Sequence, residues 1–282
     1  MDVLETIKQF VSTIDVIDVA CVAGLVLFGV WLLKTSFGRK ALADSAPRRN
    51  NMPIYLPFIP ALIWFGPVPF AVLIAREVSA DLPDWQIAFL DNLIICVGSV
   101  ATMVVIILLV RVSFARRLKG FGLNAKTIIK DFFVGAVNLL SVWPLVMLMI
   151  VLTLYFGGLI SEDFEIQQHE ELEQISGYRQ LPLRILIVVV TVVIAPVFEE
   201  MLFRGLFQTM IRSFVGRPWL AVVISSILFS LAHYTPTHWP ALFVLAMCLG
   251  YAYEKSGSLL RPIFIHAFFN GIAIMSVLRG AD

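Results

Sequence analysis

Long apolar runs alternate with short polar segments along the chain. Residues 51–75 and 132–161 contain no charged side chain, and residues 92–110 are equally uncharged after a single acid, Asp91. About 20 consecutive apolar residues are needed to cross the hydrocarbon core of a bilayer. These three runs therefore predict transmembrane helices.

The same pattern extends over the whole chain and gives eight apolar segments. They cover residues 19–33, 54–75, 87–110, 132–156, 183–213, 218–233, 240–253 and 262–279. The last three are short, so tilted, kinked or re-entrant helices are expected among them. Prolines crowd the second segment and should bend it or loosen its start. The predicted fold is an all-α, polytopic transmembrane helical bundle of about eight spans.

Composition supports residence in the bilayer and argues against a nucleic-acid partner. Hydrophobic residues make up 59% of the chain and charged residues only 15%, whereas soluble domains have roughly 45–50% and about 25%. The net charge is only +1, and the basic residues lie between the apolar segments, where they set orientation rather than contact phosphates. The three cysteines lie in apolar runs without close spacing, which favours neither a disulfide framework nor a thiolate metal site.

Charges between the segments predict the orientation of a multi-pass protein in the cell membrane, or in the inner membrane of a bacterium. Basic clusters follow the first and third segments, and the acidic stretch 162–173 follows the fourth. Since basic loops stay in the cytoplasm, the N-terminus and the acidic stretch are predicted outside. The N-terminus contains Asp2, Glu5, Asp15 and Asp18, the wrong charge for a signal peptide, so the first segment is expected to remain attached.

Polar residues inside apolar segments gather in the last hundred positions. The chain is therefore divided into an N-terminal membrane region of about four spans, residues 1–180, and a C-terminal membrane domain, residues 181–282, which contains the candidate catalytic residues. An ionisable side chain within a span costs about 3 kcal/mol or more, which suggests a functional role. Glu199, Glu200 and Arg204 lie midway along one such span. On a helix Glu200 and Arg204 share a face and can pair, which leaves Glu199 on another face, unpaired and suited to act as a general base.

Two further spans contribute polar side chains. Phe229 and His233 are one turn apart, as are His266 and Asn270. Glutamate, two histidines and asparagine from three spans suit the activation of water and the stabilisation of an oxyanion. Taken singly, each group has a structural alternative: a buried ion pair, a satisfied core histidine, or a hydrogen bond between helices. Their occurrence together in one block favours catalysis.

Other polar residues are expected to have no catalytic part. His169 lies in the acidic stretch and His238 in a proline-rich turn, and both are expected to be solvated. Asp91 and Asn92 lie near the end of a span and are expected to face water or to cap a helix.

Three motifs, in this order on successive spans, resemble one known family. They are Glu-Glu-x-x-x-Arg from Glu199, Phe-x-x-x-His from Phe229 and His-x-x-x-Asn from His266. The family is the CPBP group of intramembrane proteases, which contains the CAAX prenyl endopeptidases and the bacteriocin-processing or Abi proteins. The resemblance covers residues 183–279 and implies a polar cavity between spans. It also implies that Glu199 acts as base together with His233, and that His266 and Asn270 stabilise the oxyanion.

The expected function is therefore that of an intramembrane endopeptidase, with Glu200, Arg204 and Phe229 as structural support. Its partners would be the lipid bilayer and a membrane-embedded or lipidated peptide or protein substrate, CAAX-like or other. Two alternatives stay open: a non-catalytic immunity or scaffold protein of the same family, and a proton-coupled transporter, which the absence of an inverted repeat disfavours.

A cofactor is not expected, although zinc is the alternative. Glu199, His233 and His266 could form a zinc set of two histidines and one carboxylate. That arrangement would use the base as a ligand, and the His-Glu-x-x-His signature of zinc peptidases is absent. A metal-free mechanism is therefore favoured.

Overall fold

The structure is a computed structural model that describes residues 16–280, and within these residues it is helical with no β-strand. The helices up to the acidic stretch are α2 (Val16–Lys34), α3 (Phe58–Phe65), α4 (Pro67–Val78), α5 (Asp84–Ser113), α6 (Arg117–Phe121), η1 (Ala125–Thr127) and α7 (Ile128–Gly158). Those that follow are α8 (Glu170–Gly177), α9 (Leu181–Val189), η2 (Val190–Ile194), α10 (Ala195–Glu200), η3 (Met201–Gln208), α11 (Thr209–Val215), α12 (Pro218–Leu231), η4 (Pro236–His238), α13 (Trp239–Ser256) and α14 (Leu260–Gly280). The all-α prediction is confirmed.

All eight predicted apolar segments are helical. Five helical stretches of the described chain are long and apolar enough to cross a membrane, namely 58–78, 84–113, 125–158, 181–215 and 260–279. The other three segments form α2, α12 and α13, which fall outside that set. An integral membrane protein of several spans is thus supported, while the count of eight stays a prediction. The N-terminal acids Asp2, Glu5 and Asp15 lie outside the described residues.

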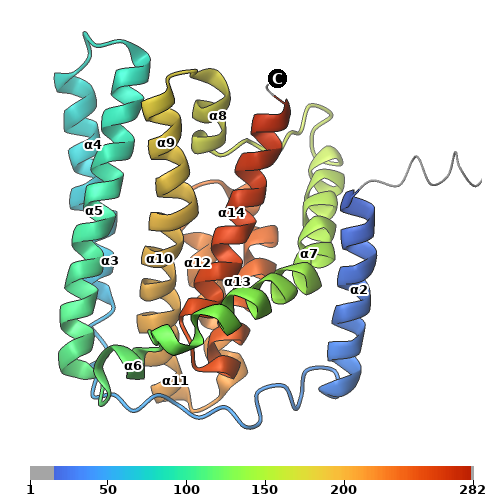
Figure 1. Ribbon diagram of the computed structural model, residues 1–282. Coiled ribbons are helices and arrows are strands. Elements are labelled where there is room, and N and C mark those ends of the chain that lie inside the picture. Colours follow the sequence, from blue (N-terminus) through green and yellow to red (C-terminus); the bar gives the residue numbers. More distant parts are fainter. Residues whose placement is uncertain (1–15, 281–282) are drawn as a thin grey trace, which may run out of the picture.

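Proline shapes two of the long helices. The second apolar segment is divided at Gly66, where α3 ends and α4 begins with Pro67. α7 contains Pro144 and is bent along its length (Figure 1). Proline cannot donate a backbone hydrogen bond and its ring crowds the preceding turn, so both deviations follow from the sequence.

The bundle has two chemically different ends (Figure 1). The basic connections after α2 and α5 lie at one end, together with α6 and α11, whereas α8 and the C-terminus lie at the other. This arrangement places the basic and acidic connections on opposite faces, as the predicted orientation requires. Which face is cytoplasmic stays a prediction.

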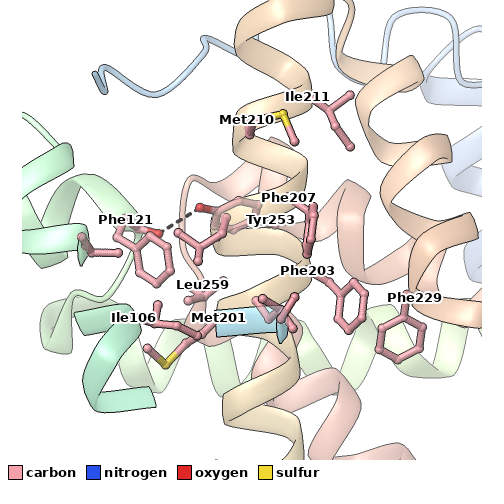
Figure 2. Close-up of a cluster of buried hydrophobic side chains, with 14 of the residues drawn as sticks. Ile106, Phe121, Met201, Phe203, Phe207, Met210, Ile211, Phe229, Tyr253 and Leu259 are labelled. Atoms are coloured by element: carbon pink, nitrogen blue, oxygen red, sulfur yellow. Dashed lines mark hydrogen bonds between the residues drawn. The ribbon is translucent and has the colours of Figure 1, made fainter. Parts of the chain in front are cut away.

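The main hydrophobic core surrounds the helix of residues 201–211. Met201, Phe203 and Phe207 from this helix pack against buried side chains of α5, α6, α12 and α13 (Figure 2). Tyr253 of α13 donates its hydroxyl hydrogen to the backbone oxygen of Phe121 at 3.0 Å. The buried Tyr hydroxyl is thereby satisfied, and α6 is tied to the centre of the bundle.

Two polar residues expected to face water are in fact buried. Asp91 and Asn92 are each only 3% exposed. Arg76 of α4 donates to Asp91 at 2.7 Å, and Asn92 donates to Gln174 of α8 at 2.8 Å. The expectation was wrong because α4 and α5 form a hairpin, so the end of one helix supplies a counter-ion to the start of the next.

The predicted orientation can be tested with single cysteines in a background that lacks Cys21, Cys96 and Cys248. Lys119 lies in α6 and Gln168 shortly before α8, and both are exposed. α6 and α8 lie at opposite ends of the bundle (Figure 1). We expect Lys119→Cys to react with a membrane-impermeant maleimide only after the membrane is opened, and Gln168→Cys to react in intact cells. The converse labelling would overturn the orientation.

Candidate active site

The site is built on one long helix whose hydrogen bonding changes register twice. Between α9 and α11, residues 190–194 and 201–208 form π-helical turns. In the first of these, the amide of Ala195 donates to the oxygen of Val190, five residues back. The next residue, Pro196, has no amide hydrogen, so this register leaves the oxygen of Thr191 without a helical donor. Asn270 of α14 fills that role, since its Nδ2 donates to the Thr191 oxygen at 2.8 Å.

The ion pair that the spacing predicts is present at the centre of the bundle. Arg204 Nη1 donates to Glu200 Oε1 at 2.9 Å, and both side chains are 0% exposed. Arg204 Nη2 also donates to the backbone oxygen of Ala246 at 3.3 Å. The guanidinium carbon lies 4.3 Å from the ring centroid of Phe229, close enough for a cation–π contact. Arg204 thus ties together the helices that contain Glu200, Phe229 and Ala246.

A line of polar side chains continues from this pair toward the basic end of the bundle. Gln208 Nε2 donates to the Gly250 oxygen at 3.0 Å, and Arg212 Nε donates to Glu254 at 3.0 Å. The three donors lie four residues apart, at 204, 208 and 212. Their acceptors on α13 are also four residues apart, at 246, 250 and 254. In an α-helix each step of four turns about 40°, which would carry Arg212 away from this face. The wider π-helical turns of 201–208 offset that drift.

Glu199 differs from Glu200 in both exposure and bonding. Its side chain is 21% exposed, and its Oε2 is buried yet accepts no hydrogen bond from any described residue. Glu200 Oε2 also lacks a partner among these residues, but Glu200 Oε1 is bonded to both Arg204 and His266. His266 lies between the two glutamates: its Nδ1 is 3.0 Å from Glu200 Oε1, and its Nε2 is 3.9 Å from Glu199 Oε2. His266 is therefore held by Glu200 and presents its other nitrogen toward Glu199.

His233 lies just beyond the end of α12 and is oriented by its own helix. Its Nδ1 is 2.8 Å from the Phe229 oxygen. A carbonyl oxygen only accepts, so Nδ1 bears the hydrogen and Nε2 is left with its lone pair. The centroid of its ring lies 4.8 Å from that of Phe229, and the centroid of the His266 ring lies 5.7 Å from that of Phe229. Phe229 therefore contacts both histidines.

The predicted residues thus gather in one region. Contacts connect Glu199 to His266, His266 to Glu200 and Phe229, and Phe229 to His233. Asn270 is one turn from His266 but donates one amide hydrogen to Thr191, so only its second amide hydrogen is left for a substrate. The arrangement offers a carboxylate without a hydrogen-bond partner, 3.9 Å from His266 Nε2, an imidazole with a free lone pair, and two polar groups that can donate.

Sequence reasoning missed a group of polar side chains near the candidate site. They come from the acidic stretch and from the turn before α13. The rings of His169 and His238 lie 4.0 Å apart and both are half-buried, so neither is freely solvated as expected. Burial lowers the pKa of His169 to about 4, with help from the nearby His238 and His233. Glu171 of α8 is likewise within electrostatic range of Glu199 and His233. The sequence did not reveal that these residues lie near the candidate site, because they are far from Glu199 and His233 along the chain or belong to segments expected to be solvated.

Comparison with known proteins supports the resemblance seen in the motifs. Residues 181–272 match the family described as type II CAAX prenyl endopeptidase Rce1-like. The chain is also 33% identical over 92 residues to an uncharacterized 24.3 kDa protein of Escherichia coli, and this match covers 31% of the chain and 42% of the relative. The chain thus spans about two fifths of the length of that curated relative. No solved structure matches the chain.

The ion pair should matter for folding as well as for activity. Replacing Arg204 by Ala leaves Glu200 charged in an apolar interior, which should cost about 3–5 kcal/mol. The double change Glu200→Gln with Arg204→Met should recover much of this loss, because neither partner is then a buried charge. Thermal unfolding of the purified variants in detergent measures both effects.

Arg179→Ala is the matched control, since Arg179 is exposed and should change stability by no more than about 0.5 kcal/mol. A double variant no more stable than the two single variants would show that the pair is not what stabilises this region.

Proposed function

We propose that this protein is an intramembrane endopeptidase that cleaves a peptide bond in a membrane-embedded or lipidated substrate. The observation that carries the proposal is the difference between two adjacent carboxylates. Glu200 is fully buried and bonded to Arg204 and His266, whereas Glu199 is partly exposed and has no hydrogen-bond partner among the described residues. The match of residues 181–272 to a peptidase family supports the same reading.

In the proposed reaction Glu199 is the general base. It takes one proton from a water molecule, with His233 Nε2 accepting a hydrogen bond from the same water and orienting it. The water oxygen bonds to the scissile carbonyl carbon and the carbonyl electrons move to oxygen, which gives a tetrahedral oxyanion. When the carbon–nitrogen bond breaks, Glu199 returns its proton to the leaving amine. The products are a carboxylic acid and an amine, and the enzyme is regenerated.

His266 and Asn270 are proposed to stabilise the oxyanion. His266 Nε2 faces Glu199 at 3.9 Å, so it borders the place where a carbonyl under attack would lie. Donation from Nε2 requires a ring with both hydrogens, because Nδ1 already donates to Glu200. Asn270 has its second amide hydrogen available. Removing such a donor typically lowers kcat by about 10²–10³.

We further propose that the reaction needs no metal. Each histidine engages its Nδ1 and leaves Nε2 free, which would suit a zinc ligand as well as a base. However, in the described part of the chain no three His, Cys, Asp or Glu side chains are grouped so that they could hold a metal ion. Zinc bound by Glu199, His233 and His266 would also use as a ligand the carboxylate that the proposed reaction needs as its general base.

A non-catalytic scaffold of the same family is the second candidate, and it would retain the same fold. It gives no reason for an unpaired glutamate beside an oriented histidine, because a buried carboxylate without a partner destabilises a protein that has no use for it. Proteolysis of a membrane-anchored reporter distinguishes the two.

We expect Glu199→Gln to reduce cleavage of such a reporter by about 10²–10⁴-fold, because the amide cannot accept the proton. The melting temperature should stay nearly unchanged or rise, since a buried carboxylate without a partner is removed. Glu173→Gln, on the exposed side of α8, is the matched control and should retain full activity. A loss of activity that merely follows a loss of folded protein would refute the role of Glu199.

Metal dependence is tested by elemental analysis of active protein together with activity after exhaustive chelation. The proposal predicts no stoichiometric metal and unchanged cleavage. Zinc at one equivalent, with activity lost on its removal and restored on its return, would show that the mechanism is a metal-dependent one.

A further inference from the structure

A cleft of about 370 Å³ opens beside the candidate site. One wall is apolar and comes from α3, α4 and α5; it includes Trp64, Val68, Val72, Leu73 and Ile95. The polar lining comes from α8, with Glu170, Glu171 and Gln174, and from Arg76, Asp91 and Asn92 at the ends of α4 and α5. Ala232 and Tyr234, just beyond the end of α12, also line the cleft. The cleft therefore has an apolar face and an acidic face.

The cleft adjoins the catalytic groups on two sides. Trp64, in its apolar wall, contacts Phe198, with ring centroids 4.6 Å apart, and Phe198 directly precedes Glu199. Ala232 and Tyr234 are the two neighbours of His233. A peptide bound between Glu199 and His233 would thus have its flanking residues in this cleft.

The cleft contains more acidic than basic side chains. Asp91, Glu170 and Glu171 line it together with a single cation, Arg76. Arg76 binds Asp91 at 2.7 Å and Glu170 at 3.1 Å, so two of the three acids share its charge. Among the described residues no cation and no side-chain donor binds Glu171. The carboxylate without a cation is therefore Glu171, which is within electrostatic range of Glu199 and His233.

We propose that Glu171 is a specificity-determining residue that binds a lysine or arginine side chain of the substrate close to the scissile bond. This inference rests on the proposed function. The substrate class it defines is a peptide with apolar groups and, next to them, a basic residue beside the cleaved bond. Charge complementarity favours such a cation in a cleft with three carboxylates and one guanidinium, and a neutral or acidic residue would leave Glu171 unpaired or repelled.

The surroundings of Glu171 also predict how the preference depends on pH. Burial raises the pKa of Glu171 above its ordinary value, against the effect of a hydrogen bond from its own backbone amide. The carboxylates of Glu170 and Glu199 raise this pKa further, while His233 lowers it. A basic side chain binds the ionised form. The preference should therefore be full at high pH and fade as pH falls through this raised pKa, sooner than for an ordinary glutamate.

The test compares two membrane-anchored peptides that differ only by Lys or Gln next to the cleaved bond. Wild-type protein should cleave the Lys peptide with a kcat/KM roughly 10- to 100-fold higher, the range of a charge-assisted hydrogen bond. Glu171→Gln should abolish the difference, and Glu171→Lys should favour the corresponding Glu peptide. Glu173→Gln makes the same charge change on the same helix outside the cleft and should retain the preference.

A binding measurement separates this inference from the proposed function. In the Glu199→Gln background, which is not expected to cleave, the Lys peptide should bind roughly 10- to 100-fold more tightly than the Gln peptide, and adding Glu171→Gln should make the two equal. Equal binding with Glu171 present would overturn the inference. If the Lys peptide binds selectively but the wild-type protein cleaves neither peptide, only the proposed function is overturned. If cleavage depends on Glu199 but is equal for the Lys and Gln peptides, only the role of Glu171 is overturned.

Discussion

A guanidinium group with no exposed surface in the interior of an apolar bundle must be neutralised and hydrogen-bonded where it lies, since either failure costs several kcal/mol. Arg204 is neutralised by Glu200 and also contacts the Ala246 oxygen and the ring of Phe229, while its Nε has no hydrogen-bond partner among the described residues. Those three partners belong to three different helical segments. The position of one cation therefore fixes how α10, α12 and α13 pack together. The side chains that contact its partners are positioned by the same interactions.

The catalytic geometry follows from the same constraint. Glu200 is committed to Arg204, so it can also hold His266 by Nδ1 and direct the Nε2 nitrogen toward Glu199. Phe229 contacts Arg204 and the rings of both His233 and His266. Glu199, one residue from Glu200, is the carboxylate that this network leaves without a partner. Adjacent residues of the same type thus acquire different chemical roles from their surroundings.

Much of the fold and part of the site could be predicted from the sequence, and the reasons are local. Apolar runs gave the helices, and a spacing of four gave the pair of Glu200 and Arg204. Less could be said where partners come from distant segments. The burial of Asp91 depends on Arg76 across a hairpin, and the proximity of Glu171 to the site depends on how α8 folds back over the bundle.

The π-helical turns were also missed, although one signal was available. Pro196 removes the amide that would have bonded a carbonyl in the preceding turn, so an unsatisfied acceptor could be expected there. What the sequence could not say is that Asn270, about 80 residues later, would supply the donor. That bond joins α14 to the helix that contains Glu199, and it limits how many hydrogens Asn270 has left for a substrate.

The proposed mechanism depends on Glu199 being the carboxylate without a hydrogen-bond partner and on Glu200 being bonded to Arg204 and His266. The most direct measurement is reaction of the folded protein with a membrane-permeant carbodiimide, followed by peptide mapping with mass spectrometry. The account predicts an adduct on Glu199, loss of activity in proportion to it, and an unmodified Glu200. An adduct on Glu200 with Glu199 spared, or equal modification of both, would contradict it.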